Sequence, residues 1–138
     1  MTSKVRIAIT GARAPVALHL ARLLIEAGHY VTLVDHLKHP LAAASQLHLS
    51  YCRIPAFSED TEAAGDALHD IILKQGISFV IPTCEEILHL GALWKRKPPK
   101  ATLFSPKLAE LIQFHHKYNF IRLCDNLGLS TPRTSLVT

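Results

Sequence analysis

The stretch KVRIAITGARAPVA, residues 4–17, decides the fold of this chain. Its first half is an apolar, β-branched run that ends at Gly11, which is typical of a buried strand. Apolar residues then recur at helical spacing up to residue 24, so a helix is predicted to follow the strand directly. Pro15 suits the first turn of that helix, where its missing N–H costs no hydrogen bond, and Gly28 is placed to end the helix in a left-handed conformation.

The same alternation of strand and helix patterns continues along the chain. Further strands are predicted at residues 30–34, 51–54, 77–81 and 101–104. Helices are predicted at residues 40–46 and 60–75, from Thr83, from the pair Ser105 and Pro106, and at residues 115–126. Strands that alternate with helices in this way form βαβ units with a parallel sheet and right-handed crossovers. The predicted fold is an α/β, Rossmann-like three-layer α/β/α sandwich with a parallel sheet of about five strands, plus a C-terminal helix.

The domain organisation and the ligand crevice follow from this fold. We expect a Rossmann-like domain over residues 1–113 and, at residues 114–138, a helix and an extended segment that lead away from it. With the usual strand order of such sheets, ligands bind beyond the carboxyl ends of the strands, where the order reverses. That point lies between the first and fourth strands, so the expected walls are residues 11–15 and 82–86.

Composition limits the classes of protein to which the chain can belong. Its 138 residues are 49% hydrophobic and 19% charged, which fits one globular domain and excludes a disordered chain and a disulfide scaffold. The longest uncharged stretch, residues 39–52, is too short for a membrane helix, and the first residues carry no targeting pattern. Three widely spaced cysteines fit a reducing compartment, so a cytoplasmic location without a membrane partner is expected. The basic residues at 95–100 lie in a predicted loop, so no nucleic-acid partner is expected.

The loop after the first strand departs from a dinucleotide-binding loop. Arg13 stands where such a loop needs a second glycine for the approach of a pyrophosphate, so tight NAD binding is not expected, although Asp35 stands where a ribose-binding acid would be. The helix N-terminus with Arg13 beside it is a seat for a carboxylate or one phosphate. In the second interpretation, which is equally favoured, Gly11 only permits close packing of helix and strand, and the Arg13 side chain points into solvent. Both interpretations stay open.

The segment after the fourth strand offers acids and a thiol. Thr83 and Glu86 have the spacing of a capping box, which assigns Glu86 to the start of a helix. Glu85 is then the acid available to bind an amine or hydroxyl of a substrate. Cys84 near the same helix start is a candidate nucleophile with a lowered pKa, but a role as a small packing residue is favoured. The nine histidines show no metal-binding spacing, so no metal site is expected.

Several short motifs together resemble a known family. They are residues 9–17, the segment IPTCEE at 81–86, the pair at 105–106, and Lys117 ahead of LGLSTP at 127–132. In this combination the chain resembles the N-terminal part of ATP-grasp enzymes, and it is most similar to the branch called carbamoyl phosphate synthase large-subunit-like. The resemblance covers essentially the whole chain.

The resemblance implies a function. ATP-grasp enzymes use ATP and magnesium to activate a carboxylate as an acylphosphate, which an amine or thiol then attacks. Their N-terminal, pre-ATP-grasp domain helps to bind the acceptor substrate, so Gly11, Arg13 and Glu85 would border that crevice here. Lys117 matches a lysine that contacts the nucleotide in several members. It is preceded by histidines where many relatives have an aspartate.

The resemblance also implies what other parts of the protein must supply. The glycine-rich loop, its lysine and the acidic magnesium ligands come later in the family, so this chain alone is not expected to catalyse phosphoryl transfer. The implied partners are an ATP-grasp domain, in cis or as a separate chain, and a small carboxylate or amine substrate, with a homodimer left open. Two alternatives remain. One is a free-standing Rossmann-like module that binds a small anionic metabolite or nucleotide, and the other is a nucleotide-sugar or NAD-dependent enzyme with a degenerate glycine loop.

Overall fold

A computed structural model describes residues 3–45 and 49–137, and strands and helices alternate through the first 105 residues of the chain. The elements in chain order are β1 (Arg6–Thr10), α1 (Pro15–Glu26), β2 (Tyr30–Asp35), the 3-10 helix η1 (Leu41–Ala44), β3 (Ser50–Arg53), α2 (Thr61–Gln75), β4 (Phe79–Pro82), α3 (Glu86–Arg96), β5 (Thr102–Leu103), α4 (Leu108–His115) and α5 (Lys117–Asn126). The helix predicted at residues 40–46 is the shorter η1, and Gln46 lies outside the described residues.

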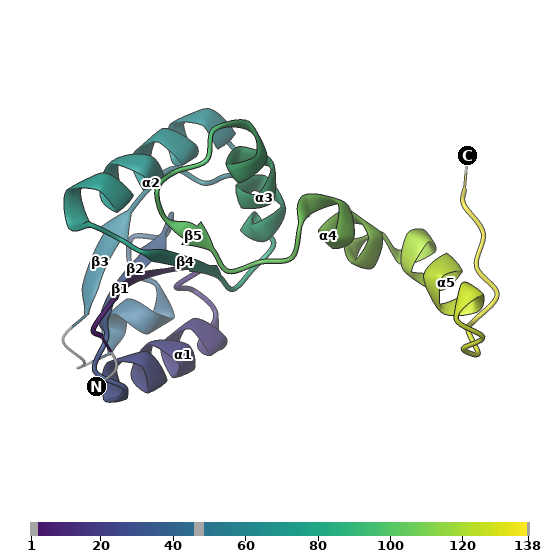
Figure 1. Cartoon of the computed structure of the whole chain (residues 1–138), viewed down its shortest axis with the longest axis horizontal. Coiled ribbons are helices and arrows are strands. Elements are labelled where there is room, and N and C mark those ends of the chain that lie inside the picture. The colour runs from purple at the N-terminus through teal and green to yellow at the C-terminus, as the bar shows by residue number, and fades with distance from the viewer. Residues whose placement is uncertain (1–2, 46–48, 138) are drawn as a thin grey trace. The chain divides into compact units, whose positions relative to one another are not determined.

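The five strands form one parallel sheet in the order β3-β2-β1-β4-β5. Helix α1 covers one face of the sheet, and α2 and α3 cover the other (Figure 1). The predicted Rossmann-like α/β/α sandwich is therefore confirmed, with the strand order expected from its βαβ units. Because β1 lies at the centre, its carboxyl end adjoins those of β2 and β4.

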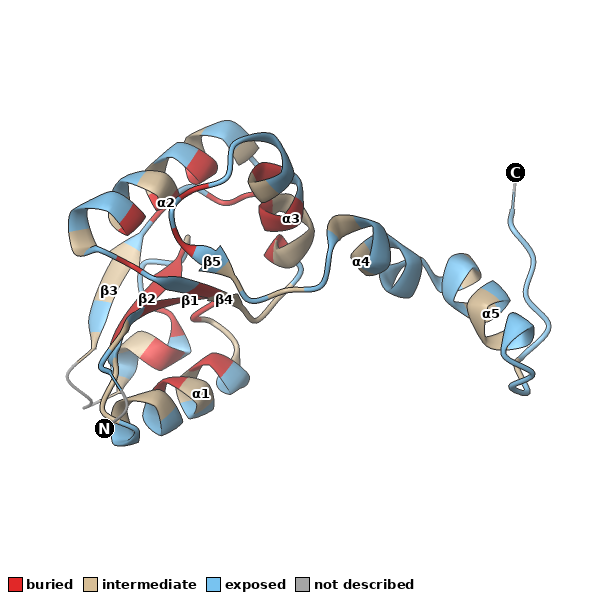
Figure 2. Ribbon diagram, viewed as in Figure 1, coloured by how far each residue is buried: buried red, intermediate tan, exposed pale blue. Residues whose placement is uncertain are grey.

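The core consists of two apolar layers, one on each face of the sheet. Alternate residues of a strand point to opposite faces, so Ile7 and Ile9 of β1 pack with α1 while Ala8 packs with α2 and α3. Figure 2 shows the buried residues concentrated in β1 and β2 and on the sheet-facing sides of the helices. Burial on both faces explains why the strands read as nearly continuous apolar runs in the sequence.

Most predicted helix boundaries in the sandwich are confirmed. Pro15 is the first residue of α1, and Gly28 adopts a φ of 89° just after that helix. Helix α2 begins after Asp60, whose side chain accepts a hydrogen bond from the N–H of Ala63, and it ends at Gly76 with a φ of 62°. These ends are set by local chemistry, which is why the sequence predicts them.

Two predicted helix starts are wrong. Glu86 does not close a capping box with Thr83, because α3 begins at Glu86 itself and the Thr83 hydroxyl donates to the β1–α1 segment instead. Pro106 does not begin α4, which starts at Leu108, where the N–H of Lys107 donates to the Glu110 carboxylate. At α3 the Thr83 hydroxyl bonds to a segment distant in sequence, and at α4 the acid at Glu110 caps the N–H of Lys107, two residues after the expected cap.

The chain divides into two compact units, residues 1–105 and residues 106–138. The first unit is the sandwich, and the second contains α4, α5 and an extended segment, with Gly128 in the left-handed region just after α5. The second unit thus starts at Pro106, ahead of the sequence-based boundary after residue 113. Neither α4 nor α5 has a buried residue. Among the described helices, none has the length and apolar character needed to cross a membrane.

Candidate functional site

A pocket of about 210 Å³ opens at the carboxyl ends of the central strands. Its lining comes from the ends of β1 and β2, the segment that joins β3 to α2, and the start of α3. The lining residues are Thr10, Gly11, Arg13, Val34, Asp35, His36, Ile54, Pro55, Ala56, Phe57, Ser58, Glu85, Glu86 and His89. This is the edge of the sheet where ligands of such folds bind. A shallower hollow of about 880 Å³ lies at the opposite, amino-terminal edge.

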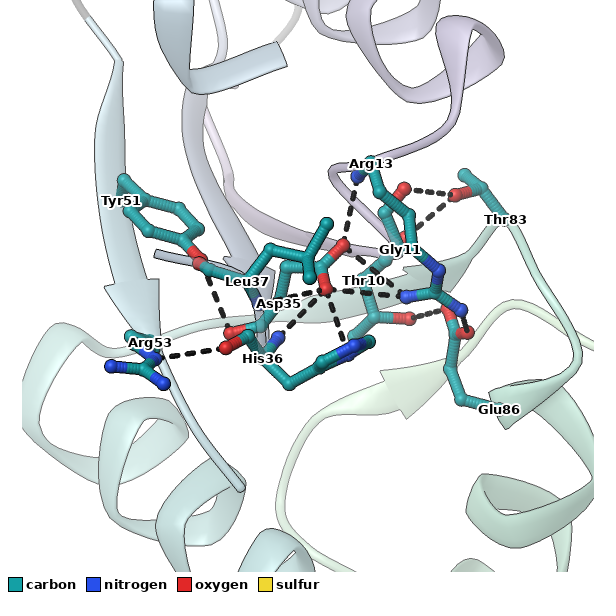
Figure 3. Close-up of polar contacts among 10 residues, drawn as sticks. All are labelled: Thr10, Gly11, Arg13, Asp35, His36, Leu37, Tyr51, Arg53, Thr83 and Glu86. Carbon is teal, nitrogen blue, oxygen red and sulfur yellow. Dashed lines mark hydrogen bonds and ion pairs between the residues drawn. The ribbon is translucent and has the colours of Figure 1, made fainter. Parts of the chain in front are cut away.

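Arg13 lies between two carboxylates at the centre of this pocket (Figure 3). Its Nη1 is 3.2 Å from Oδ2 of Asp35, and its Nη2 is 3.1 Å from Oε2 of Glu86. Partial burial acts to lower the pKa of Arg13, but the two carboxylates outweigh it and raise the pKa above the ordinary arginine value. The guanidinium is therefore not freely solvated, and it is already paired with carboxylates of the chain instead of being available to an anionic ligand.

Asp35 holds the loop that follows β1 against the end of β2. Its carboxylate accepts hydrogen bonds from the backbone N–H of Arg13 at 2.8 Å and of His36 at 2.7 Å, and its side chain is fully buried. The His36 Nδ1 lies 3.0 Å from the same carboxylate. The acid that stands at the ribose-binding position of a dinucleotide fold is thus engaged within the chain, which argues against NAD binding.

Glu86 joins the start of α3 to β1. It is only 8% exposed, and its Oε1 accepts the Thr10 hydroxyl at 2.8 Å while Oε2 faces Arg13. The Thr83 hydroxyl donates to the carbonyls of Thr10 and Gly11 at 2.7 and 3.2 Å. Sequence reasoning missed Glu86 as a pocket residue because the threonine-to-glutamate spacing matched a helix cap. Its place directly after a strand end was the signal that pointed to the pocket.

Gly11 is required at this junction for two reasons. Its φ of 76° lies in the left-handed region, which disfavours any residue with a Cβ. A Cβ would also lie 2.6 Å from Thr83 Oγ1, 2.8 Å from Glu86 Oε1 and 2.9 Å from Cys84 Sγ. The close approach of the β1–α1 segment to the start of α3 therefore depends on glycine, and this approach shapes one wall of the pocket.

Glu85 and Cys84 lie beside Glu86 but differ from it in exposure. Glu85 is exposed and lines the pocket, and no ion pair joins it to another residue of the described chain. Cys84 is half-buried, and burial together with the Glu86 carboxylate raises the pKa of its thiol above the ordinary value. The idea of a nucleophilic Cys84 with a lowered pKa is therefore wrong, because the helix start brings a buried carboxylate close to the sulfur.

His89 forms a further part of the pocket that sequence reasoning missed. It lies one turn beyond the start of α3, and its ring stacks on that of Phe57 with a centroid distance of 6.0 Å. Its Nδ1 is 3.1 Å from the hydroxyl of Thr61, the first residue of α2. In the sequence, His89 is an isolated histidine on a helix with one apolar face, and this pattern gives no signal for a contact with distant residues. The contact joins α3 to α2 and to the segment before α2.

Three of the four predicted site residues belong to the first unit, and the fourth belongs to the second unit. Gly11, Arg13 and Glu85 all line the pocket of the first unit. Lys117 is the exposed first residue of α5 in the second unit. Within residues 3–45 and 49–137, no three histidine, cysteine or acidic side chains are grouped so that they could hold a metal ion.

The fold and the pocket define a Rossmann-like α/β protein with a site at the carboxyl edge of its sheet. No family model and no curated protein sequence matches this chain. Its structure is similar, however, to the N-terminal portion of ATP-grasp enzymes over nearly the whole chain.

Three solved structures show the range of the similarity. The L-amino acid ligase from Bacillus licheniformis matches with a TM-score of 0.72 and 16% identity, over 96% of this chain and 32% of its own. The biotin carboxylase domain of a single-chain bacterial carboxylase matches with a TM-score of 0.67 and 20% identity, over 98% of this chain and 32% of its own. The dTDP-glucose 4,6-dehydratase from Bacillus anthracis, in complex with NAD, matches with a TM-score of 0.54 and 14% identity, over 72% of this chain and 36% of its own. This chain thus spans about a third of each matched protein, and at these identities the similarity establishes the fold.

Proposed function

We propose that this chain is the N-terminal substrate-binding domain of an ATP-grasp ligase that joins a carboxylate to an amine or thiol through an acylphosphate. The observation that carries the proposal is the extent of the structural match. The two ATP-grasp matches extend over 96% and 98% of the chain, so they include most of the second unit, whereas the NAD-dependent dehydratase covers 72%. A plain dinucleotide-binding fold accounts for the sandwich, and the ATP-grasp arrangement accounts for α4 and α5 as well.

The pocket supports a role in substrate binding. In this proposal Gly11, Arg13 and Glu85 are the substrate-binding residues, since all three line the pocket at the edge of the sheet where ligands bind. Its volume of about 210 Å³ is below the range of about 300 to 1,000 Å³ of most ligand pockets, so it suits a small substrate group and not a whole nucleotide. ATP would accordingly bind elsewhere.

ATP and magnesium belong to the remainder of the proposed enzyme. The described residues hold no metal-ligating cluster, so the proposal assigns the magnesium ligands to the ATP-grasp part and derives no catalytic step within this chain. ATP would supply the phosphoryl group that activates the carboxylate. Lys117 would contact that nucleotide, because it is an exposed cation at the start of a helix in the second unit, which the two ATP-grasp matches largely include.

The proposed partner is the ATP-grasp part itself, in cis or as a separate chain, in a cytoplasmic protein of the carbamoyl phosphate synthase large-subunit-like branch. The alternative of a free-standing module for a small anion has less support, because Arg13 is already paired with Asp35 and Glu86. An anion would have to displace one of these carboxylates before it could reach the guanidinium.

The test is to determine the coding sequence that follows Thr138 and to assay the whole product. We expect roughly 150 or more further residues with a glycine-rich loop and acidic metal ligands. The product should release phosphate from magnesium-ATP only when both a carboxylate and an amine or thiol are supplied. Lys117→Met should raise the KM for ATP, with Lys107→Met, another lysine of the second unit, as the control. The proposal would be contradicted if neither this gene nor a separate chain that binds its product supplied those elements, or if residues 1–138 alone released phosphate.

A further inference from the structure

His89 is a pocket residue whose tautomer in the neutral form can be derived from its contacts. The Thr61 hydroxyl lies 2.7 Å from the carbonyl oxygen of Phe57 and 3.1 Å from Nδ1 of His89. A carbonyl oxygen can only accept, so the single hydroxyl hydrogen of Thr61 is donated to Phe57. The hydroxyl oxygen must then accept from His89, which places a hydrogen on Nδ1. In the neutral imidazole, Nε2 is therefore an acceptor.

The Nε2 atom is available to a molecule in the pocket. No hydrogen bond joins it to another residue in the described part of the chain, whereas Nδ1 is held by Thr61. Every fully buried side-chain nitrogen or oxygen in that same part has a partner, so an Nε2 without one is reached by solvent. Because His89 lines the pocket and its ring is held against Phe57, this acceptor has a fixed position there.

The charges around the pocket select the kind of group that can occupy it. The pocket lining contains one guanidinium, that of Arg13, and three carboxylates, those of Asp35, Glu85 and Glu86, so negative charge is in excess. The carboxylate of Asp35 is saturated by contacts within the chain, but each Glu86 oxygen accepts from a single donor among the residues that the structure describes. A carboxylate oxygen can accept two hydrogen bonds, so Glu86 retains the capacity to bind an N–H donor. The field of the pocket favours a cation over an anion.

We propose that His89 is a ligand-binding residue, held as the Nδ1–H tautomer by Thr61, and that the pocket takes the ammonium group of a small primary amine. The amine donates one hydrogen bond to Nε2 of His89, and its charge is compensated by Glu85 and Glu86. Thr61 acts through His89 and is a positioning residue. This inference rests on the proposed function in one respect: of the substrates of the proposed ligase, it assigns the amine to the pocket of this domain.

Nitrogen NMR tests the tautomer directly on the 138-residue chain. At about pH 8, above the usual range of imidazole titration, the ¹⁵N shifts of His89 should show a hydrogen on Nδ1 and none on Nε2. Thr61→Val, which removes the hydroxyl at nearly constant volume, should move the hydrogen toward Nε2. Thr61→Ser, which keeps the hydroxyl, should restore the wild-type shifts. A wild-type His89 with its hydrogen on Nε2 would overturn the inference.

Binding of three matched probes tests the ligand class. At about pH 8, where amine and carboxylate are both charged, n-propylamine should bind at least about tenfold more tightly than propionate, with 1-propanol in between. Binding should shift the Nε2 resonance of His89. His89→Phe keeps a ring against Phe57 but removes the acceptor, so it should weaken n-propylamine binding by about tenfold, the value of one hydrogen bond. His19→Phe, an exposed position of α1 outside the pocket, is the control and should leave binding unchanged.

Three results would overturn the inference: no detectable binding of n-propylamine, equal or tighter binding of propionate, or unchanged amine binding in His89→Phe. These failures are distinct from a failure of the proposed function. If n-propylamine binds as expected but neither the coding sequence past Thr138 nor a separate partner chain supplies ATP-grasp elements, the inference stands and the ligase proposal falls. If those elements are present and the amine does not bind, the ligase proposal stands and the inference that the pocket binds an amine is rejected.

Discussion

Arg13 is the residue on which the polar network of the pocket depends, because its side chain is one-third exposed while both carboxylate partners are buried. Removal of one member of a buried ion pair leaves an uncompensated charge, which costs about 3 to 5 kcal/mol in fully buried cases. Asp35 and Glu86 would both lose their cationic partner at once. Arg13 is therefore a structural residue of the site as well as one of its walls.

We expect Arg13→Met to lower the free energy of unfolding by about 2 to 3 kcal/mol, below the fully buried case because the guanidinium is partly solvated. Urea unfolding followed by circular dichroism measures this. Arg22→Met, at an exposed position of α1, is the matched control and should stay within about 0.5 kcal/mol of wild type. Equal effects of the two substitutions would show that the ion pairs of Arg13 do not stabilise the fold.

Gly11 and Gly28 form a natural pair for a second test. Both have positive φ, 76° and 89°, but a Cβ at Gly28 would meet no atom within 4 Å, whereas one at Gly11 would meet three below 3 Å. Gly28→Ala should cost about 1 to 2 kcal/mol from the backbone conformation alone. Gly11→Ala should cost at least about 2 kcal/mol more, because Thr83 and Glu86 must move. Similar losses in the two variants would contradict the close packing at Gly11.

Cys84 makes stability depend on pH in the alkaline range. Its pKa is raised in the folded chain by burial and by Glu86, so the unfolded chain releases the thiol proton first as pH increases. Stability contributed by the protonated thiol is therefore present below about pH 8.5 and is lost as pH rises above that value. Between about pH 8 and 10, the free energy of unfolding of the wild type should therefore fall relative to that of Cys84→Ala. A constant difference, measured in urea at several pH values, would contradict this.

Helices α4 and α5 differ at the scale of elements from those of the sandwich. Neither has a buried residue, and Ile112, Phe114 and Phe120 are 48%, 54% and 42% exposed. Short helices without tertiary packing have little stability of their own. They carry apolar side chains, and in the proposed enzyme those side chains would be covered by the ATP-grasp part.

Hydrogen exchange of the isolated chain should show this difference. We expect the amides of α4 and α5 to exchange many times faster than those of β1 and β2, whose residues are largely buried within the sheet. Exchange monitored by NMR or mass spectrometry resolves the elements. Protection of α5 comparable to that of β1 would mean that the helix already has a packing partner within this chain, against the expectation.

Sequence reasoning worked best at the ends of elements with their own local signal. Pro15, Asp60 and Gly76 each act within a few residues of chain, so α1 and α2 were predicted nearly to the residue. It failed for α3, where the pattern of a capping box was present but Thr83 bonded across the sheet edge to the β1–α1 segment. A local pattern predicts a local partner, and it fails when a distant partner is closer in space.

For the whole molecule, both apolar layers of the core belong to the first unit. A chain of residues 1–105 should therefore fold and should keep its melting temperature within a few degrees of the 138-residue chain. Calorimetry of the two chains checks this. A loss of cooperative unfolding on removal of residues 106–138 would show that the second unit stabilises the sandwich.

The sequence by itself determined the strands and most of the helices, and the strand order agrees with the usual 3-2-1-4-5 order that this fold class led us to expect. These features depend on hydrophobic periodicity and on helix and turn signals that act over a few residues. Only the tertiary structure decided that Arg13 lies between Asp35 and Glu86, partners 22 and 73 residues away, and that Thr61 orients His89 across 28 residues. Periodicity cannot specify such pairs, because their distances depend on how separate strands and helices pack around the sheet.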